Sequence, residues 1–149
     1  MLVQVTFLPA EAPRYCFPEQ SKSAATDGRT GRLRVLVVDD EQLIATTVAA
    51  ILNSNGFEAV AAFSGDEALA EARRVRPDIV LSDVLMPKMS GVELGMQLRN
   101  EFPEARVVLF SGQAATTEMM RKAHEKGYQF DLIAKPIHPE ELVARLRGL

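Results

Sequence analysis

The sequence has no tryptophan, a single cysteine, and no apolar run near the length of a membrane-spanning helix. Because such a helix needs about 20 consecutive apolar residues, we expect a soluble, cytoplasmic protein with no membrane contact. Cys16 has no second cysteine with which to form a disulfide inside the chain. A net charge of only -3 gives no electrostatic reason to expect a nucleic acid partner. These shortages exclude a disulfide scaffold and a basic nucleic-acid-binding chain.

The composition is that of an ordinary globular domain. Hydrophobic residues make up 47% of the 149 residues and charged residues 25%, which excludes a chain that is disordered throughout. The first 31 residues differ, because they contain three prolines and a small, polar stretch at 21–31. We expect residues 1–31 to form a disordered N-terminal extension and residues 32–149 to form the domain. A secretory signal is the weaker alternative for the extension, since no basic residue precedes its apolar stretch.

Beyond the extension, short apolar runs alternate with amphipathic stretches about a dozen residues long. This alternation is typical of βα units on a parallel sheet. The five runs lie at 33–38, 57–62, 79–82, 106–110 and 130–134. The second run is the weakest and predicts an edge strand. Right-handed crossovers then give an α/β fold with a doubly wound, five-stranded parallel sheet and helices on both faces.

The helices between these strands have recognisable ends. The first carries Leu43, Ile44, Val48, Ile51 and Leu52 at helical spacing and stops at Asn55-Gly56. The second and third begin with Ser64 to Glu67 and Ser90 to Glu93, which both read as capping boxes. The fourth contains Met119, Met120 and Ala123 and ends at Gly127, and the fifth begins at His138-Pro139 and buries Leu142, Val143 and Leu146.

Ligands of open parallel sheets bind beyond the carboxyl ends of the strands. At those ends the sequence has Asp39 and Asp40, then Asp83, Ser111 and Lys135. Carboxylates held close together can all stay ionised if a cation lies among them, and hard oxygen ligands suit Mg2+. A carboxylate beside such a metal can attack phosphorus to give an aspartyl phosphate. The lysine and the serine hydroxyl would then contact the phosphoryl oxygens.

Each of these residues has a simpler interpretation when taken alone. Asp39 or Asp40 equally fits a helix cap, and Asp83 fits a turn. Ser111 fits a helix start and Lys135 fits a solvated lysine at a strand end. Their order along one edge of one sheet favours the phosphoryl-accepting site over these separate interpretations.

Four segments together resemble the response regulator receiver family of two-component signalling: Val35 to Glu41, Pro77 to Pro87 with Gly91 after it, Val107 to Gly112, and Lys135-Pro136. The resemblance covers roughly Arg32 to Leu149. It implies a receiver domain over 32–149 with the flavodoxin-like strand order 2-1-3-4-5. It also implies that a sensor histidine kinase or a histidine phosphotransfer protein donates a phosphoryl group to this domain.

The family's site residues transfer onto matching positions of this sequence. Asp83 would accept the phosphoryl group, and Ser111 and Lys135 would contact its oxygens. Asp40, Asp83 and the backbone carbonyl of Leu85 would bind Mg2+ directly, while Asp39 would act through water. The Lys135-Pro136 peptide bond would be cis, a form that only X-Pro bonds adopt at small cost.

The sequence departs from the family at Leu132, which stands where an aromatic switch residue is usual, three positions before the lysine. The residues of the phosphoryl-accepting site are thus all present, while the residue that would couple this site to the output surface is altered. Family output passes through the fourth helix, fifth strand and fifth helix, a face that would include Met119, Arg121, Lys122, Arg145 and Arg147. Single basic residues there also fit an ordinary solvated surface. Because the sequence ends after the fifth helix, we expect no attached output domain, an unknown output protein, and a monomer or weak dimer.

Three functions remain open at this stage. The leading hypothesis is a phosphorylation-dependent switch that is not an enzyme and assists only its own phosphotransfer and dephosphorylation. The second is a pseudo-receiver, a phosphorylation-independent interaction module, which only Leu132 supports. The third is a metal-dependent phosphohydrolase, which the Asp39-Asp40-Glu41 order and the lack of a cap insertion disfavour.

One kinetic property also follows from the sequence. Leu85 and Gln113 lie two positions after Asp83 and Ser111 and should flank the path of the water that hydrolyses the aspartyl phosphate. An apolar Leu85 cannot orient that water. The sequence therefore predicts slow self-dephosphorylation, on a scale of minutes or longer.

Overall fold

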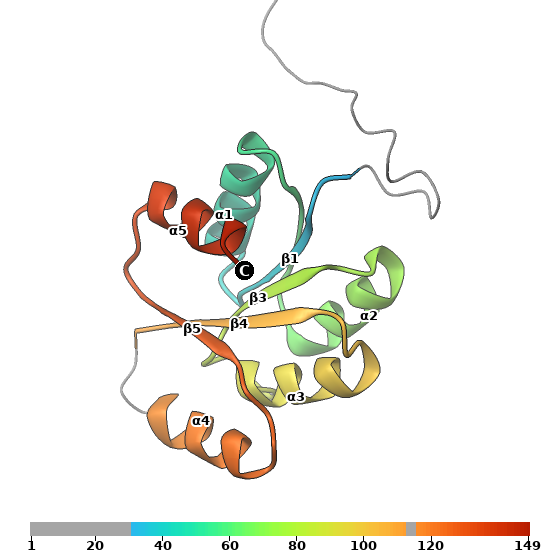
Figure 1. Cartoon of the computed structure of the whole chain (residues 1–149), viewed down its shortest axis with the longest axis vertical. Helices are drawn as coiled ribbons and strands as arrows, with labels where there is room; N and C mark the ends of the chain where they lie inside the picture. The colour runs from blue at the N-terminus through green and yellow to red at the C-terminus, as the bar shows by residue number, and fades with distance from the viewer. Residues whose placement is uncertain (1–30, 113–115) are drawn as a thin grey trace, which may run out of the picture. The chain divides into compact units, whose positions relative to one another are not determined.

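Five parallel strands form one sheet in the order β2-β1-β3-β4-β5 (Figure 1). The computed structural model describes residues 31–112 and 116–149, so residues 1–30 of the predicted N-terminal extension and Gln113 lie outside the described residues. Residues 33–149 make up one compact unit. The strands are β1 (Arg34–Val38), β2 (Glu58–Ala62), β3 (Ile79–Asp83), β4 (Arg106–Ser111) and β5 (Asp131–Ala134). The predicted fold and the predicted edge position of the second strand are confirmed.

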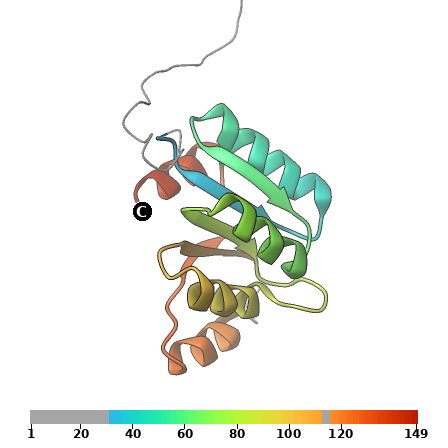
Figure 2. The ribbon, with the colours of Figure 1, turned by 90° about the vertical axis from the view of Figure 1, so that its right-hand side faces the viewer.

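The helices cover both faces of this sheet (Figures 1 and 2). On one face lie α1 (Gln42–Ser54) and α5 (Pro139–Arg147), and on the other lie α2 (Gly65–Val75), α3 (Gly91–Glu101) and α4 (Thr116–Glu125). Successive residues of β1 therefore face different cores: Val35 and Val37 pack under α1 and α5, whereas Leu36 and Val38 pack under the other three helices. Burial on both faces explains why the central strands are apolar without alternation.

The helix ends follow the predicted signals with one change. Ser90 and Glu93 form a complete capping box at the start of α3. At the start of α2 the Ser64 hydroxyl accepts a hydrogen bond from the Glu67 N–H, but the Glu67 carboxylate accepts one from Phe63 instead of from Ser64. The second predicted capping box is therefore incomplete, because the Glu67 carboxylate binds the backbone N–H one residue before the N-cap Ser64.

Helix α1 buries most of the apolar residues that the sequence places at helical spacing, because Leu52 lies in the core and Val48 and Ile51 pack against it, but Leu43 lies outside this buried side. Ala45, Ala49 and Leu52 are its buried residues, while Leu43 is 80% exposed. Leu43 precedes Ala45 by two positions, and two positions correspond to about 200° around a helix, so the two side chains point in opposite directions. Leu43 thus shares the predicted helix with the other apolar residues but not their buried side.

Candidate functional site

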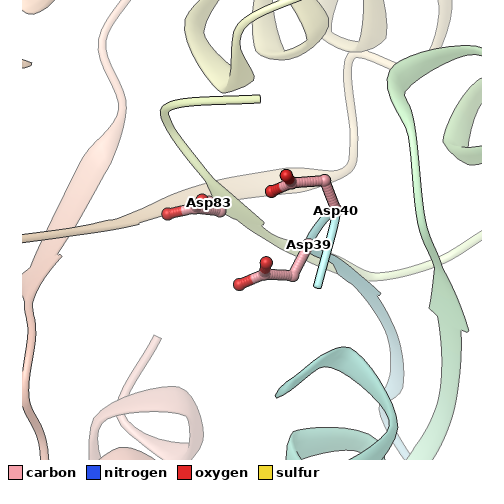
Figure 3. Close-up of side chains that lie close together, drawn as sticks. All are labelled: Asp39, Asp40 and Asp83. Atoms are coloured by element: carbon pink, nitrogen blue, oxygen red, sulfur yellow. The ribbon is translucent and has the colours of Figure 1, made fainter. Parts of the chain in front are cut away.

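Three aspartates converge at the carboxyl ends of β1 and β3. These strands are neighbours, with Val38 opposite Ser82, so the residues that follow them meet at the same edge. One carboxylate oxygen from each of Asp39, Asp40 and Asp83 lies within 4.8 Å of the others (Figure 3). The three groups offer only oxygen ligands, and Asp40 is exposed, which leaves one side accessible to solvent. The donor set therefore fits a hard, partly hydrated cation such as Mg2+.

Asp39 has a structural bond as well as a place in this cluster. Its side chain is buried, and one of its oxygens accepts a hydrogen bond from the Glu41 N–H at 2.9 Å. Glu41 is the residue before α1 and its own side chain makes no cap hydrogen bond. Asp39 is therefore not the N-cap residue of α1, although its Oδ1 accepts from the N–H of that residue, while its Oδ2 lies 3.6 Å from Lys135 Nζ in the cluster.

Lys135 brings the one ammonium group seen at the cluster among the described residues. Its Nζ lies 3.1 Å from Asp83 Oδ1 and 3.6 Å from Asp39 Oδ2. The same Nζ lies 4.9 Å from the ring centroid of Phe110, a cation–π contact that the sequence did not indicate. The Lys135-Pro136 peptide bond is cis. Three carboxylates thus face one positive charge, so the cluster carries an excess of negative charge.

The electrostatic surroundings act unequally on Asp83. Burial raises the pKa of its carboxyl above the ordinary range, and the nearby charge of Asp39 acts in the same direction. The hydrogen bond and charge of Lys135 oppose this rise, as does a hydrogen bond from the backbone N–H of Val84. A bound cation would favour the ionised form in the same way as Lys135 does.

The other predicted site residues lie around this group. Ser111 is the last residue of β4 and is buried, and its carbonyl accepts a hydrogen bond from the Lys135 N–H at 3.0 Å. Leu85 follows Asp83 by two residues, and its side chain is 44% exposed. The structure thus brings Ser111, Lys135 and the three aspartates to one edge of the sheet, as the spacing predicted.

Sequence reasoning missed Ser82, which has no motif of its own. This residue is 1% exposed, and its hydroxyl donates a hydrogen bond to the backbone carbonyl of Asp83 at 2.9 Å. The one signal that could have found it is its position directly after the apolar run Ile79 to Leu81. A hydroxyl that is buried at the end of such a run needs a hydrogen-bond partner.

The surface around β5 agrees only in part with the sequence. Leu132 lies on this edge strand and is 44% exposed. The Arg145 guanidinium donates a hydrogen bond to its carbonyl at 3.2 Å, so Arg145 belongs to this surface. Arg147 does not, because it donates to the carbonyl of Asn55 and lies 5.6 Å from the Phe57 ring, beside β2 at the opposite edge of the sheet. The grouping of Arg147 with the fourth helix is therefore corrected.

The strand order and helix arrangement place the chain among doubly wound α/β proteins of the flavodoxin-like type. A family model described as the response regulator receiver domain matches residues 35–147, and the chain belongs to this family. Receiver domains serve in two-component signalling, where histidine kinases are their partners, and they are generally not enzymes. Phosphorylation and Mg2+ binding are typical of the family.

Among its relatives, the chain is 40% identical over 115 residues to the probable transcriptional regulatory protein TcrX of Mycobacterium tuberculosis, with 77% of this chain and 48% of that protein covered. It is 35% identical over 119 residues to the DNA-binding response regulator MtrA of Mycolicibacterium smegmatis, covering 80% and 51%. The chain thus spans about half the length of the curated relatives it matches.

Two solved structures show the same arrangement. The chemotaxis protein CheY4 of Vibrio cholerae is 28% identical with a TM-score of 0.71, covering 79% of this chain and 98% of that one. The receiver domain of NtrX from Brucella abortus is 33% identical with a TM-score of 0.67, covering 76% and 95%. No helix among the described residues is long and apolar enough to cross a membrane.

Proposed function

We propose that this chain is a phosphorylation-dependent signalling switch in which Asp83 accepts a phosphoryl group from a histidine kinase or a histidine phosphotransfer protein. One observation carries the proposal. The Lys135 ammonium lies 3.1 Å from Asp83 within a cluster of three carboxylates. Lysine and an acidic cation site beside one half-buried carboxylate are what a phosphoryl acceptor needs, because the transferred group carries negative charge that must be neutralised.

The transfer would proceed by attack of an Asp83 carboxylate oxygen on the phosphorus of the donor. A new P–O bond forms, the P–N bond to the donor imidazole breaks, and the imidazole nitrogen keeps the electron pair of that bond. Lys135 and the Ser111 hydroxyl would contact the phosphoryl oxygens. Asp39, Asp40, Asp83 and the Leu85 carbonyl would hold Mg2+, which when bound supplies positive charge to the same oxygens.

The switch would report its state through the surface of α4, β5 and α5. The new charge and acceptor oxygens would draw Ser111 toward the phosphoryl group and rearrange the residues behind it. On that surface Arg145 already contacts Leu132. We propose that an output protein reads this surface in the cytoplasm and that the receiver residues themselves contact no nucleic acid. The DNA-binding relatives match this chain over about half their length, so a DNA-binding activity of a longer protein would not conflict with that.

A second candidate is a pseudo-receiver that binds its partner without phosphorylation. It is favoured by Leu132 alone, because an exposed leucine replaces the aromatic residue expected to couple site and surface. Acetyl phosphate separates the two candidates. Its attack by Asp83 forms the aspartyl phosphate and breaks the P–O bond to acetate, which leaves with the electron pair.

The test measures intact mass after incubation with acetyl phosphate and Mg2+. The proposal expects a gain of roughly 80 Da in the wild type, lost with EDTA and in Asp83→Asn. Asp66→Asn is the matched control, because this exposed carboxylate lies in the first turn of α2 outside the cluster. Multiple turnover of acetyl phosphate with no lasting mass gain would indicate a phosphohydrolase. No gain, either with acetyl phosphate or with a phosphorylated histidine donor, would support the pseudo-receiver.

A further inference from the structure

Phe110 brings an apolar ring to the site of the candidate phosphoryl acceptor. In the sheet it pairs with Asp83 of β3 on one side and with Ile133 of β5 on the other. Paired residues of neighbouring parallel strands point to the same face of the sheet. The ring belongs to the core that α1 and α5 cover, and Phe110 is 9% exposed. A buried ring therefore lies beside Asp83 on this face.

Lys135 reaches from the end of β5 over this ring. Its N–H donates a hydrogen bond to the Ser111 carbonyl at 3.0 Å, which holds its backbone at the end of β4. Its Nζ lies over the Phe110 ring, 4.9 Å from the ring centroid. The same Nζ lies 3.1 Å from Asp83 Oδ1 and 3.6 Å from Asp39 Oδ2. The ammonium is thus held between two carboxylates and the face of a ring.

The ring attracts this ammonium without adding charge to the site. The face of an aromatic ring carries partial negative charge and attracts a cation above it. This attraction is stronger where water is partly excluded, and the Lys135 side chain is only 27% exposed. A further carboxylate would also attract the ammonium, but it would repel the negatively charged phosphoryl group. A ring is therefore the better third contact for a lysine that must also contact phosphoryl oxygens.

We propose that Phe110 is a positioning residue for the phosphoryl acceptor, and that its ring holds the Lys135 ammonium toward Asp83 by a cation–π contact. A leucine at this position would fill much of the same core space but has no π face. The flexible lysine side chain would then spend less time against Asp83. The kinetic part of this inference rests on the proposed function. The contact itself can be measured without phosphorylation.

The kinetic test compares Phe110→Leu with the wild type and with Phe57→Leu. Phe57 is a matched control, because it is a buried ring of the same core and has its own cation–π contact with Arg147 at 5.6 Å. At saturating Mg2+ and fixed acetyl phosphate we expect Phe110→Leu to be phosphorylated about three to ten times more slowly, the value of one cation–π contact. Phe57→Leu should match the wild type.

Fluorinated phenylalanines at position 110 separate the cation–π contact from packing. Fluorine atoms withdraw electron density from the face of the ring and weaken its attraction to a cation, while the shape of the ring hardly changes. We expect the phosphorylation rate to fall stepwise from phenylalanine through the monofluoro and difluoro to the trifluoro analogue. The same series at position 57 should leave the rate unchanged.

The spectroscopic test follows the methylene protons next to Lys135 Nζ by NMR, in the full chain without Mg2+ or a phosphoryl donor. Protons over the face of a ring are shielded by its ring current. We therefore expect these resonances to lie upfield of those of an ordinary lysine in the wild type. Phe110→Leu should return them to the ordinary position, whereas Phe57→Leu should leave them upfield. This result depends on where the ring lies relative to the lysine and not on any reaction.

The possible failures have different meanings. A wild type that gains no phosphoryl group overturns the proposed function and the kinetic role of Phe110 together. A phosphorylated wild type whose rate does not follow the number of fluorine atoms means that the ring acts only by packing, which overturns the positioning role alone. Lys135 resonances that are ordinary in the wild type and unmoved in Phe110→Leu overturn the contact itself, whatever the rates are.

Discussion

The two ends of the sheet differ in how their charged side chains are paired. At the amino end of the strands, charged groups are matched: Arg106 lies 2.9 Å from Asp131, and Arg73 forms a two-point ion pair with Glu101 between α2 and α3. At the carboxyl end, Asp39, Asp40 and Asp83 form a cluster in which, among the described residues, the Lys135 ammonium contacts Asp39 and Asp83. The first arrangement is balanced without a ligand, whereas the second lacks positive charge.

This difference separates structural charges from functional ones. Exposed ion pairs such as Arg106–Asp131 contribute little to stability, because water screens them and ordering long side chains costs entropy. Carboxylates crowded at one site repel, which disfavours the folded state unless a cation is gained. The carboxyl end therefore gains stability from a bound cation, whereas the amino end does not require one.

The largest effect is expected from removing Lys135, the ammonium group that lies against Asp39 and Asp83 among the described residues. Lys135→Ala should slow phosphorylation by acetyl phosphate about a hundredfold, because a charged donor to the transferred group is lost. Intact mass measured over time gives the rate. Lys126→Ala removes an exposed lysine beyond α4 and serves as control. An unchanged rate in Lys135→Ala would mean that the contact at 3.1 Å is only structural.

The next effect concerns Mg2+ binding at the three carboxylates. Mg2+ at a hundred times its dissociation constant should raise the free energy of unfolding by about 2.7 kcal/mol, since it binds only the folded state. Asp40→Asn should remove most of this gain at the same Mg2+ concentration, because one of three carboxylates loses its charge. Urea denaturation with and without Mg2+ measures both values. Equal Mg2+ gains in the wild type and Asp40→Asn would place the cation elsewhere.

A smaller effect is expected beside the site, at Leu85. Leu85→Gln adds a polar group two residues after Asp83, where it can orient the hydrolytic water, and should speed loss of the phosphoryl group roughly threefold to tenfold. The decay of the phosphorylated mass after removal of acetyl phosphate gives the rate. Leu43→Gln makes the same exchange at an exposed position of α1 and should not change it. Equal decay in both variants would contradict slow hydrolysis by an apolar Leu85.

The contrast between the two ends also explains what could be predicted from the sequence. Asp39, Asp83 and Lys135 were found because each follows an apolar strand, and parallel strands bring those positions to one edge. The cation–π contact of Lys135 with Phe110 was not found, because it depends on how two neighbouring strands align their side chains. Strand ends are set by local pattern, whereas contacts across strands are set by register.

Surface directions were harder to predict than strand ends. Leu43 was grouped with the apolar residues at helical spacing, although it is exposed, because apolar residues near a helix start fit more than one side of the helix. Arg147 was assigned to the α4 side, but it points to β2 because Arg145 and Arg147 are two positions apart on α5. Ser82 was missed because a single serine in an apolar strand forms no pattern.

The smallest effect is expected from removing an ion pair at the amino end of the strands. Arg106→Gln should change the free energy of unfolding by less than about 1 kcal/mol, because its pair with Asp131 is half exposed on both sides. It should leave phosphorylation at the wild-type rate, since Arg106 begins β4 while Ser111 ends it. Urea denaturation and the acetyl phosphate assay measure the two values. A large loss of stability with no change in phosphorylation would mean that the amino end holds the sheet together through this pair. A slower phosphorylation would mean that the two ends are coupled through β4, and that charge balance at one end does influence chemistry at the other.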